Sequence, residues 1–190
     1  MLNLIRSALS MLGLFTLLTG LLYPAAITGL AQGLFPEKAR GSLIHKDNRI
    51  IGSALIGQSF SNARYFWGRP SATAPFPYNA GASTGSNLGP SNPALREAVG
   101  LRAEALRLSH SQTNAPIPVD LSTTSASGLD PHISPAAALF QASRVAQARG
   151  LDESQVRALV EQHIEGPFLG ILGESRVNVL RLNMALDNIH

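Results

Sequence analysis

The stretch Ala8-Leu-Ser-Met-Leu-Gly-Leu-Phe-Thr-Leu-Leu-Thr-Gly-Leu-Leu-Tyr23 decides how the rest of the chain is organised. It lies within thirty residues that carry no charged side chain, between Arg6 and Glu37. The helix that it would form is apolar on all sides. A soluble amphipathic helix instead shows a polar face at a period of about 3.6 residues. Twenty-odd residues at about 1.5 Å each cover a hydrocarbon core of about 30 Å. The sequence therefore predicts a membrane-spanning helix over 7–30, after a short segment 1–6 and before a domain over 31–190.

The end of this stretch has two interpretations. Tyr23 stands where an aromatic residue would meet the membrane surface, and Pro24 is expected to bend or end the helix. The small residues of Gly29-Leu30-Ala31 would also suit the cleavage site of a signal peptide. Against cleavage, the apolar run is longer than a signal core, and Arg6 alone marks a basic start. We favour an uncleaved anchor in the lipid bilayer.

Composition excludes several classes of function. Charged residues make up 14% of the chain, the formal net charge is +3, and there is no cysteine. Without a dense run of Lys and Arg interleaved with aromatics, nucleic acid is not an expected partner. Without cysteine, disulfides, thiolate chemistry and Cys-ligated zinc are excluded together.

The charges do not settle which side of the membrane holds the domain. Lys38, Arg40, Lys46 and Arg49 follow the span, whereas Arg6 precedes it. Basic residues normally stay in the cytoplasm, which would place the domain there, but long segments cross membranes largely regardless of charge. The orientation therefore stays open at the level of the residues.

The domain is predicted to be mixed α/β. Two strands, 42–44 and 49–56, flank a polar turn, and Phe66-Trp67 adds a short third strand. The segment 68–93 is rich in Gly, Pro, Ser and Asn, and we expect it to be ordered and packed, because it also carries Phe76 and Tyr78.

Helix signals follow this loop. Asn92 before Pro93 and Ser134 before Pro135 are typical helix starts, and Gly150 is a typical helix end. The pattern predicts helices over 93–108 and 135–149 and a third that opens at Asp152. Residues 177–182 are strand-like, and Asn183 is expected to cap a last helical turn.

Two clusters invite a chemical interpretation. Asp130, His132 and Ser134 combine a carboxylate, an imidazole and a hydroxyl, as a hydrolase would, but they equally fit a tight turn before a helix. The other histidines show no ligand spacing, so no metal site is predicted. The second cluster, Gly52 to Gln58, resembles a phosphate-binding loop but lacks its lysine, and we interpret it as a strand with a glycine turn.

Six motifs in order resemble a known family. They are Gly52-Ser-Ala-Leu-Ile-Gly-Gln-x-Phe60, Gly68-Arg-Pro-Ser-Ala72, Tyr78-Asn with Gly85-Ser-Asn-Leu-Gly-Pro-Ser-Asn-Pro93, Ser125-Ala-Ser-Gly-Leu-Asp-Pro-His-Ile-Ser-Pro135, Gln141-x-x-Arg-Val-Ala146 and Val177-Asn-Val-Leu-x-Leu-Asn183. Behind a single span, they resemble the C subunit of the bacterial Kdp potassium-transporting P-type ATPase over essentially the whole chain. Thr84, Ser143 and Ser175 depart from the family pattern.

The resemblance implies an accessory subunit, without catalysis of its own, that a potassium pump needs for assembly and activity. Its implied partners are a channel-like A subunit, an ATP-hydrolysing B subunit and a small F subunit. Segment 1–6 would then lie in the cytoplasm of a bacterial plasma membrane, with the bulk of the chain outside. ATP and potassium would belong to the complex, with no cofactor held stably here.

The family also implies a catalytic chaperone that raises the ATP affinity of the B subunit, with Gln58 at the nucleotide. A domain outside the membrane cannot touch cytoplasmic ATP, so we give precedence to the topology. The alternative function from another class is a membrane-anchored hydrolase that uses Asp130, His132 and Ser134.

Two surfaces are expected to hold the subunit in place. Gly13, Thr16 and Gly20 line one face of the span with small residues, which lets another helix approach closely. Phe76 and Tyr78 offer aromatic area for docking beside the outer mouth of the potassium-selective subunit.

Overall fold

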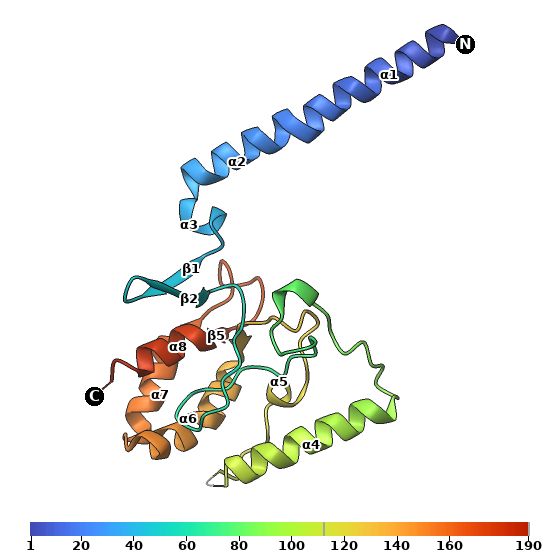
Figure 1. Cartoon of the computed structure of the whole chain (residues 1–190). Helices are drawn as coiled ribbons and strands as arrows, with labels where there is room; N and C mark the ends of the chain where they lie inside the picture. Colours follow the sequence, from blue (N-terminus) through green and yellow to red (C-terminus); the bar gives the residue numbers. More distant parts are fainter. Residues whose placement is uncertain (112, 190) are drawn as a thin grey trace. The chain divides into compact units, whose positions relative to one another are not determined.

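The computed structural model describes residues 1–111 and 113–189. The chain divides into two units, Met1–Ile51 and Gly52–His190, and each is described by itself (Figure 1). Helices and strands both occur, so the predicted mixed class is confirmed. The second unit begins at Gly52.

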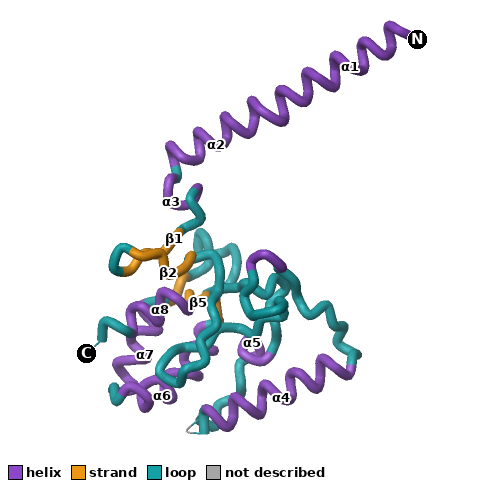
Figure 2. The backbone as a smooth tube through the Cα atoms, viewed as in Figure 1, coloured by secondary structure: helices purple, strands orange, loops and turns teal. Residues whose placement is uncertain are grey.

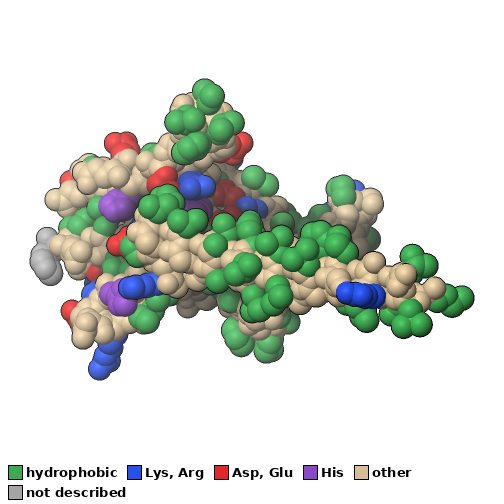
Figure 3. Space-filling model, turned by 90° about the horizontal axis from the view of Figure 1, so that it is seen from above, with side chains coloured by type: hydrophobic (Ala, Val, Ile, Leu, Met, Phe, Trp, Pro, Cys, Tyr) green, Lys and Arg blue, Asp and Glu red, His purple; other side chains and the backbone are tan. Residues whose placement is uncertain are grey.

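The first unit is dominated by one apolar helical segment, Leu2–Leu34. It comprises α1 (Leu2–Leu17), a π-helical turn (Leu18–Leu22) and α2 (Tyr23–Leu34). Its 33 residues are long and apolar enough to cross a membrane, and none of its side chains is buried inside the chain. Figure 3 shows hydrophobic side chains along its exposed surface. The helix extends beyond the predicted 7–30 at both ends.

Pro24 does not end this helix, contrary to the expectation from sequence. In the turn before it, the Tyr23 amide bonds back to the Leu18 carbonyl, a π-type step of five residues. A proline ring clashes with the carbonyl four residues earlier and leaves it without a donor. The wider turn relieves this conflict, since local π geometry is one of the adjustments by which membrane helices tolerate proline.

A short helix and a hairpin complete the first unit. The helix α3 spans Pro36–Ala39, and the strands β1 (Leu43–Lys46) and β2 (Arg49–Ser53) pair with each other. Asp47 and Asn48 form the predicted turn with positive φ values of 50° and 61°, which Asp and Asn tolerate. The second strand ends at Ser53 rather than at the predicted Ile56.

The second unit contains a small antiparallel sheet. Its strands are β3 (His132–Ile133), β4 (Ile164–Glu165) and β5 (Arg176–Asn178), in the order β3-β5-β4. Val177 lies in the central strand opposite both Ile133 and Ile164. This residue is fully buried, so the sheet is joined to the core through its middle.

Five α-helices and a short 3-10 helix (Ala80–Ala82) accompany the sheet in the described residues of this unit. The α-helices are α4 (Pro93–Ser109), α5 (Val119–Ser122), α6 (Pro135–Arg149), α7 (Glu153–Gln162) and α8 (Val179–Leu186). Asn92, Ser134 and Asp152 accept backbone amides at the starts of α4, α6 and α7, which confirms the three predicted N-caps. Gly150 ends α6 in the left-handed conformation with φ 71°, also as predicted.

The core lies among α6, α7, α8 and β5 (Figure 2). Its largest fully buried apolar side chains are Phe66, Ile133, Val145, Val156, Val160, Val177, Leu182 and Leu186. The helix α4 contributes Leu106 to this core, and Leu106 is the residue of the helix that is buried.

Two predictions for this unit are wrong. Phe66 and Trp67 form no strand, because their backbone groups bond to side-chain amides instead. Residues 179–182 are helical, and Asn178 caps that helix, whereas Asn183 lies buried within it.

Candidate functional site

Segment 63–67 is held in place by buried side-chain amides. Asn183 accepts the Phe66 amide at 2.8 Å and donates to the Phe66 carbonyl at 2.9 Å. Gln141 does the same for Trp67, at 2.8 Å and 3.1 Å. Each primary amide thus offers the donor and acceptor pair that a neighbouring strand would provide. Phe66 is buried and Trp67 half-buried, and neither belongs to a sheet.

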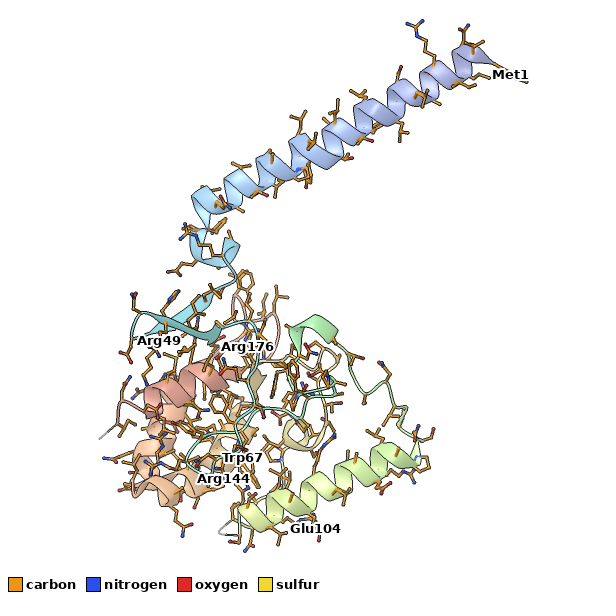
Figure 4. All side chains as sticks on the ribbon, in the orientation of Figure 1. Met1, Arg49, Trp67, Glu104, Arg144 and Arg176 are labelled. Atoms are coloured by element: carbon orange, nitrogen blue, oxygen red, sulfur yellow. The ribbon has the colours of Figure 1, made fainter. Side chains whose placement is uncertain are left out.

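Arg144 is the centre of this polar cluster. It donates to the carbonyls of Ala63 and Tyr65, to Gln141 Oε1 at 2.8 Å and to His110 Nε2 at 2.9 Å. Its guanidinium also lies 4.1 Å from the centre of the Trp67 ring, and Figure 4 labels both residues. Burial lowers the pKa of Arg144 to about 10, so the side chain stays charged at neutral pH. Its charge is therefore dispersed over several acceptors and an aromatic face.

These contacts fix the state of His110. Because Arg144 donates to Nε2, the proton of a neutral ring is on Nδ1, which lies 2.9 Å from the Leu106 carbonyl. Burial, together with the Arg144 charge, lowers the pKa of His110 to about 4 although the Leu106 carbonyl acts in the other direction. The ring is therefore neutral at pH 7, and it connects Arg144 to the backbone of α4.

The loop 68–93 is ordered and packed, as predicted. Ser71 donates to the Gly128 carbonyl at 2.7 Å and accepts the Tyr78 amide at 2.9 Å. Thr73 accepts the Asn79 amide and donates to the Phe76 carbonyl, so two hydroxyls organise the loop. The loop is thereby joined to the segment around Gly128.

The two aromatic residues of this loop differ in their surroundings. Tyr78 faces inward and donates to the Arg69 carbonyl at 2.6 Å. Its ring lies against Gly57 and Gly68, where a β-carbon would collide with it. Burial, followed by the Asp130 charge, raises the pKa of Tyr78 to about 12. Phe76 is 57% exposed, so it alone of the pair presents a largely free aromatic surface.

Gln58 also faces the interior of its unit. Its side-chain amide occupies the space that a β-carbon at Gly52 would take, close to Leu180. The Gly57 amide donates to the Leu129 carbonyl at 2.8 Å, so this turn is tied to the segment before Asp130. The glycines of the stretch therefore allow close internal packing, in agreement with its interpretation as a strand followed by a glycine turn.

Asp130 forms a local turn before β3, His132 lies in β3 and Ser134 caps α6, and the three residues do not form a catalytic triad. Asp130 accepts the His132 amide at 3.0 Å and lies 3.5 Å from His132 Nδ1. Ser134 bonds instead to Asp120, at 3.2 Å from its hydroxyl, and accepts the Ala137 amide as the cap of α6. A triad needs the hydroxyl on the imidazole.

The carboxylate of this turn is held in its ionised form. Burial alone would raise the pKa of Asp130, but hydrogen bonds from His132 and the charge of Arg69 together lower it below the usual value. Arg69 Nη1 lies 3.2 Å from Asp130, and its buried Nε has no partner within the described residues. The pair is therefore an internal ionic link between the loop 68–93 and the turn.

A cavity of about 640 Å³ opens beside this turn. Its charged and titratable lining comprises Arg69, Asp120, Asp130, His132, Glu174 and Arg176. Among the described residues, no three His, Asp or Glu side chains lie close enough together to hold a metal ion. The lining combines three carboxylates with two guanidinium groups and one imidazole, so it provides no strong preference for an anion or a cation.

The small-residue face of the membrane helix lies open. The space around Gly13 is empty, and a β-carbon at Gly20 would meet only the Thr16 methyl, at 4.0 Å. Thr16 and Gly20 therefore share a face, as their spacing predicts. No side chain of this unit fills the groove at either glycine.

Comparison with known proteins gives the family. The family model described as KdpC, the c chain of the K⁺-transporting ATPase, matches residues 5–188. The chain belongs to the KdpC family. It is 60% identical to the potassium-transporting ATPase KdpC subunit of Polaromonas naphthalenivorans, over 97% of this chain and 94% of that protein. The KdpC subunits of Sorangium cellulosum and Methylococcus capsulatus are each 59% identical, over 96% and 98% of this chain and the same shares of theirs.

Membership of the KdpC family decides between the two functions considered from sequence. KdpC proteins are subunits of the potassium-transporting ATPase complex and are not catalytic on their own. The hydrolase alternative is wrong, which agrees with the pairing of Ser134 to Asp120. With its apolar N-terminal helix, this KdpC chain is a membrane-anchored component of a larger assembly.

Sequence reasoning missed the buried polar cluster of Gln141, Arg144, His110 and Asn183. One local signal was present, because Gln141 and Arg144 stand three residues apart on a helix otherwise rich in Ala. Such a polar pair on an apolar face indicates buried hydrogen bonding. Gln141 and Arg144 bond to the backbone carbonyls of Ala63, Tyr65 and Trp67, which lie 74 or more residues away along the chain. No spacing rule in the sequence predicts contacts over such a separation.

Proposed function

We propose that this KdpC chain is an accessory, non-catalytic subunit that stabilises the assembled potassium pump and is needed for its activity. The observation that carries the proposal is the match of residues 5–188 to a pump subunit family. The internal pairing of Asp130, Ser134 and Arg144 supports it, because these polar groups act within the fold. The partners are a channel-like A subunit, an ATP-hydrolysing B subunit and a small F subunit.

We further propose that residues 31–190 lie outside the cytoplasm of a bacterial plasma membrane. A segment of this length crosses a membrane largely regardless of its charge, so the basic residues after the span do not prevent it. This placement puts the second unit beside the outer surface of the pump, away from the site of ATP hydrolysis.

In this proposal, the loop 68–93 attaches the second unit to the potassium-selective subunit of the pump. Phe76 supplies the exposed aromatic contact, and Tyr78 supports it by holding the loop against Gly57 and Gly68. Large aromatic side chains on an ordered backbone give contact area at small entropic cost, which suits an interface anchor. The loop then stabilises the complex without binding potassium itself.

The test is retention of the subunit in the purified pump. Phe76→Ala is expected to lower both retention of this chain and potassium-stimulated ATPase activity severalfold, while the potassium concentration for half-maximal activity stays constant. Leu101→Ala, on the exposed surface of α4, is the matched control and should leave both unchanged. If wild-type chain fails to co-purify with a P-type ATPase, the accessory function is wrong. A shifted half-maximal concentration at full retention would place the loop on the ion pathway.

A role in raising the ATP affinity of the B subunit, with Gln58 touching the nucleotide, is a separate proposal that follows from the family resemblance. It requires Gln58 to face the cytoplasm and to leave its position over Gly52. It is therefore incompatible with the proposed placement of residues 31–190, and the topology experiment described in the Discussion decides between them.

A further inference from the structure

The loop between β4 and β5 carries an apolar tip that the described chain does not cover. The tip consists of Phe168, Leu169, Ile171 and Leu172, which are 69%, 76%, 80% and 58% exposed. Four large apolar side chains at one turn form a contiguous exposed patch, and such patches mark interaction sites. No other feature described above uses these residues.

The tip is rigid at its base. Ile164 and Glu165 of β4 face Val177 and Arg176 of β5, and β5 is the central strand of the sheet. The Glu165 carboxylate lies 3.2 Å from Arg176 and 3.5 Å from Arg181, so ion pairs close the base of the loop. Movement of the tip is therefore coupled to a strand whose central residue is buried.

The turn itself is ordered by backbone bonds. The amides of Phe168 and Leu172 each donate to the other's carbonyl, at 2.8 Å and 2.9 Å, and the Gly170 amide donates to the Pro167 carbonyl at 3.0 Å. Leu169 takes a positive φ of 54°, a conformation that is unfavourable for leucine. Backbone strain and exposed apolar area occur at the same residue, and the internal packing of the chain compensates neither. Strain of this kind is a reason to look for a function.

The charges around the tip distinguish between lipid and protein as its occupant. Glu165 and Glu174 are balanced by Arg176 and Arg181, so the base carries no net charge. Segments that bind membrane surfaces rely on an excess of Lys or Arg to attract anionic headgroups. An apolar centre with a rim of paired charges is instead the anatomy of a protein interface.

We propose that the apolar tip Phe168–Leu172 inserts into an uncharged, apolar depression on another subunit of the same pump. The inference rests on the proposed accessory function and adds a second attachment point to the loop 68–93. The ordered turn lowers the entropic cost of docking, and burial of the four side chains removes the exposed apolar area of the free subunit.

The test uses the complete pump with this chain at full length. Ile171→Asp places a charge in the proposed pocket and is expected to lower retention of the subunit at least tenfold, the scale of an interface hot spot. Leu108→Asp is the matched control, because Leu108 is 76% exposed on α4. The melting temperature of each isolated variant should equal that of wild type, since both side chains are exposed.

A second measurement identifies the occupant. The Ile171→Cys variant is labelled with an environment-sensitive fluorophore and placed in nanodiscs, with or without spin-labelled lipids. The emission maximum of the fluorophore is expected to shift to shorter wavelength only when the other subunits are present. Quenching by spin-labelled lipid in the chain alone would show that the tip enters the bilayer, and the proposal would be wrong. Normal retention of Ile171→Asp would overturn it too, while leaving the accessory function intact if wild type still co-purifies.

Discussion

A single imidazole, that of His110, links the stability of the chain to pH. Its Nε2 accepts a hydrogen bond from Arg144. Protonation of Nε2 would remove this acceptor and place a positively charged imidazolium beside the guanidinium. The pKa is about 4 in the folded chain and about 6.5 when unfolded, so the unfolded state binds more protons between these values. The stabilising contribution is complete above pH 6.5 and is lost as the pH falls toward 4.

We therefore expect the free energy of unfolding to fall by on the order of 2 kcal/mol between pH 7 and pH 4.5, since one pKa unit corresponds to about 1.4 kcal/mol and residual hydration reduces the full effect. Denaturant titration of the full chain in detergent measures this. His110→Gln should flatten the dependence, whereas His45→Gln, on an exposed strand residue, should preserve it. An equal slope in wild type and His110→Gln would contradict the assignment.

At the scale of single elements, the membrane helix offers a test of helix packing. Leucine at positions 13 and 20 meets no obstacle within the chain, apart from the Thr16 methyl near Gly20. Gly13→Leu with Gly20→Leu should therefore insert normally but lower recovery of the pump complex severalfold, because the small face no longer admits a neighbouring helix. Quantitative co-purification from membranes checks this.

Gly29→Leu is the control for the helix experiment. It also adds a side chain in open space, and nine residues at about 100° each turn it to about 180° from Gly20. Equal loss with Gly29→Leu would mean that helix bulk, rather than this face, sets recovery. Full recovery of the complex with the double variant would mean that the second unit, rather than the membrane helix, attaches this chain to the pump.

Local signals predicted the elements that depend on neighbouring residues. The caps at Asn92, Ser134 and Asp152 were readable, because a cap and its amide lie two or three residues apart. Asn183 was misassigned, because its partner Phe66 lies 117 residues away. Pro24 failed as a helix end because the π turn before it accommodates the ring without a break in the helix. The pairing of Ser134 with Asp120 likewise depended on tertiary structure.

The side of the membrane that holds the second unit is a property of the whole molecule, and one thiol can report it. The chain has no cysteine, and Glu104 is exposed on α4, with its side chain directed outward in Figure 4. Glu104→Cys should react with a membrane-impermeant thiol reagent in intact spheroplasts, at least tenfold faster than Asn3→Cys. The second variant should react only after lysis, because the span separates the two positions.

Labelling of Glu104→Cys only after lysis would place the second unit in the cytoplasm. Contact between Gln58 and ATP would then become feasible, and docking of Phe76 at the outer surface would be wrong. Labelling of both variants in intact cells would indicate a leaky preparation, which an impermeant-reagent control on a cytoplasmic protein identifies.

The amides that hold segment 63–67 also impose an order of events during synthesis. Phe66 emerges from the ribosome 117 residues before Asn183, and Trp67 emerges 74 residues before Gln141. At roughly 5–20 residues per second, the backbone of the segment bonds to water for on the order of ten seconds before its partners exist. The unit closes late, after most of its length has been translated. Under the proposed placement of residues 31–190 outside the cytoplasm, this delay would favour translocation, because a chain whose core has not closed can still be threaded through a channel.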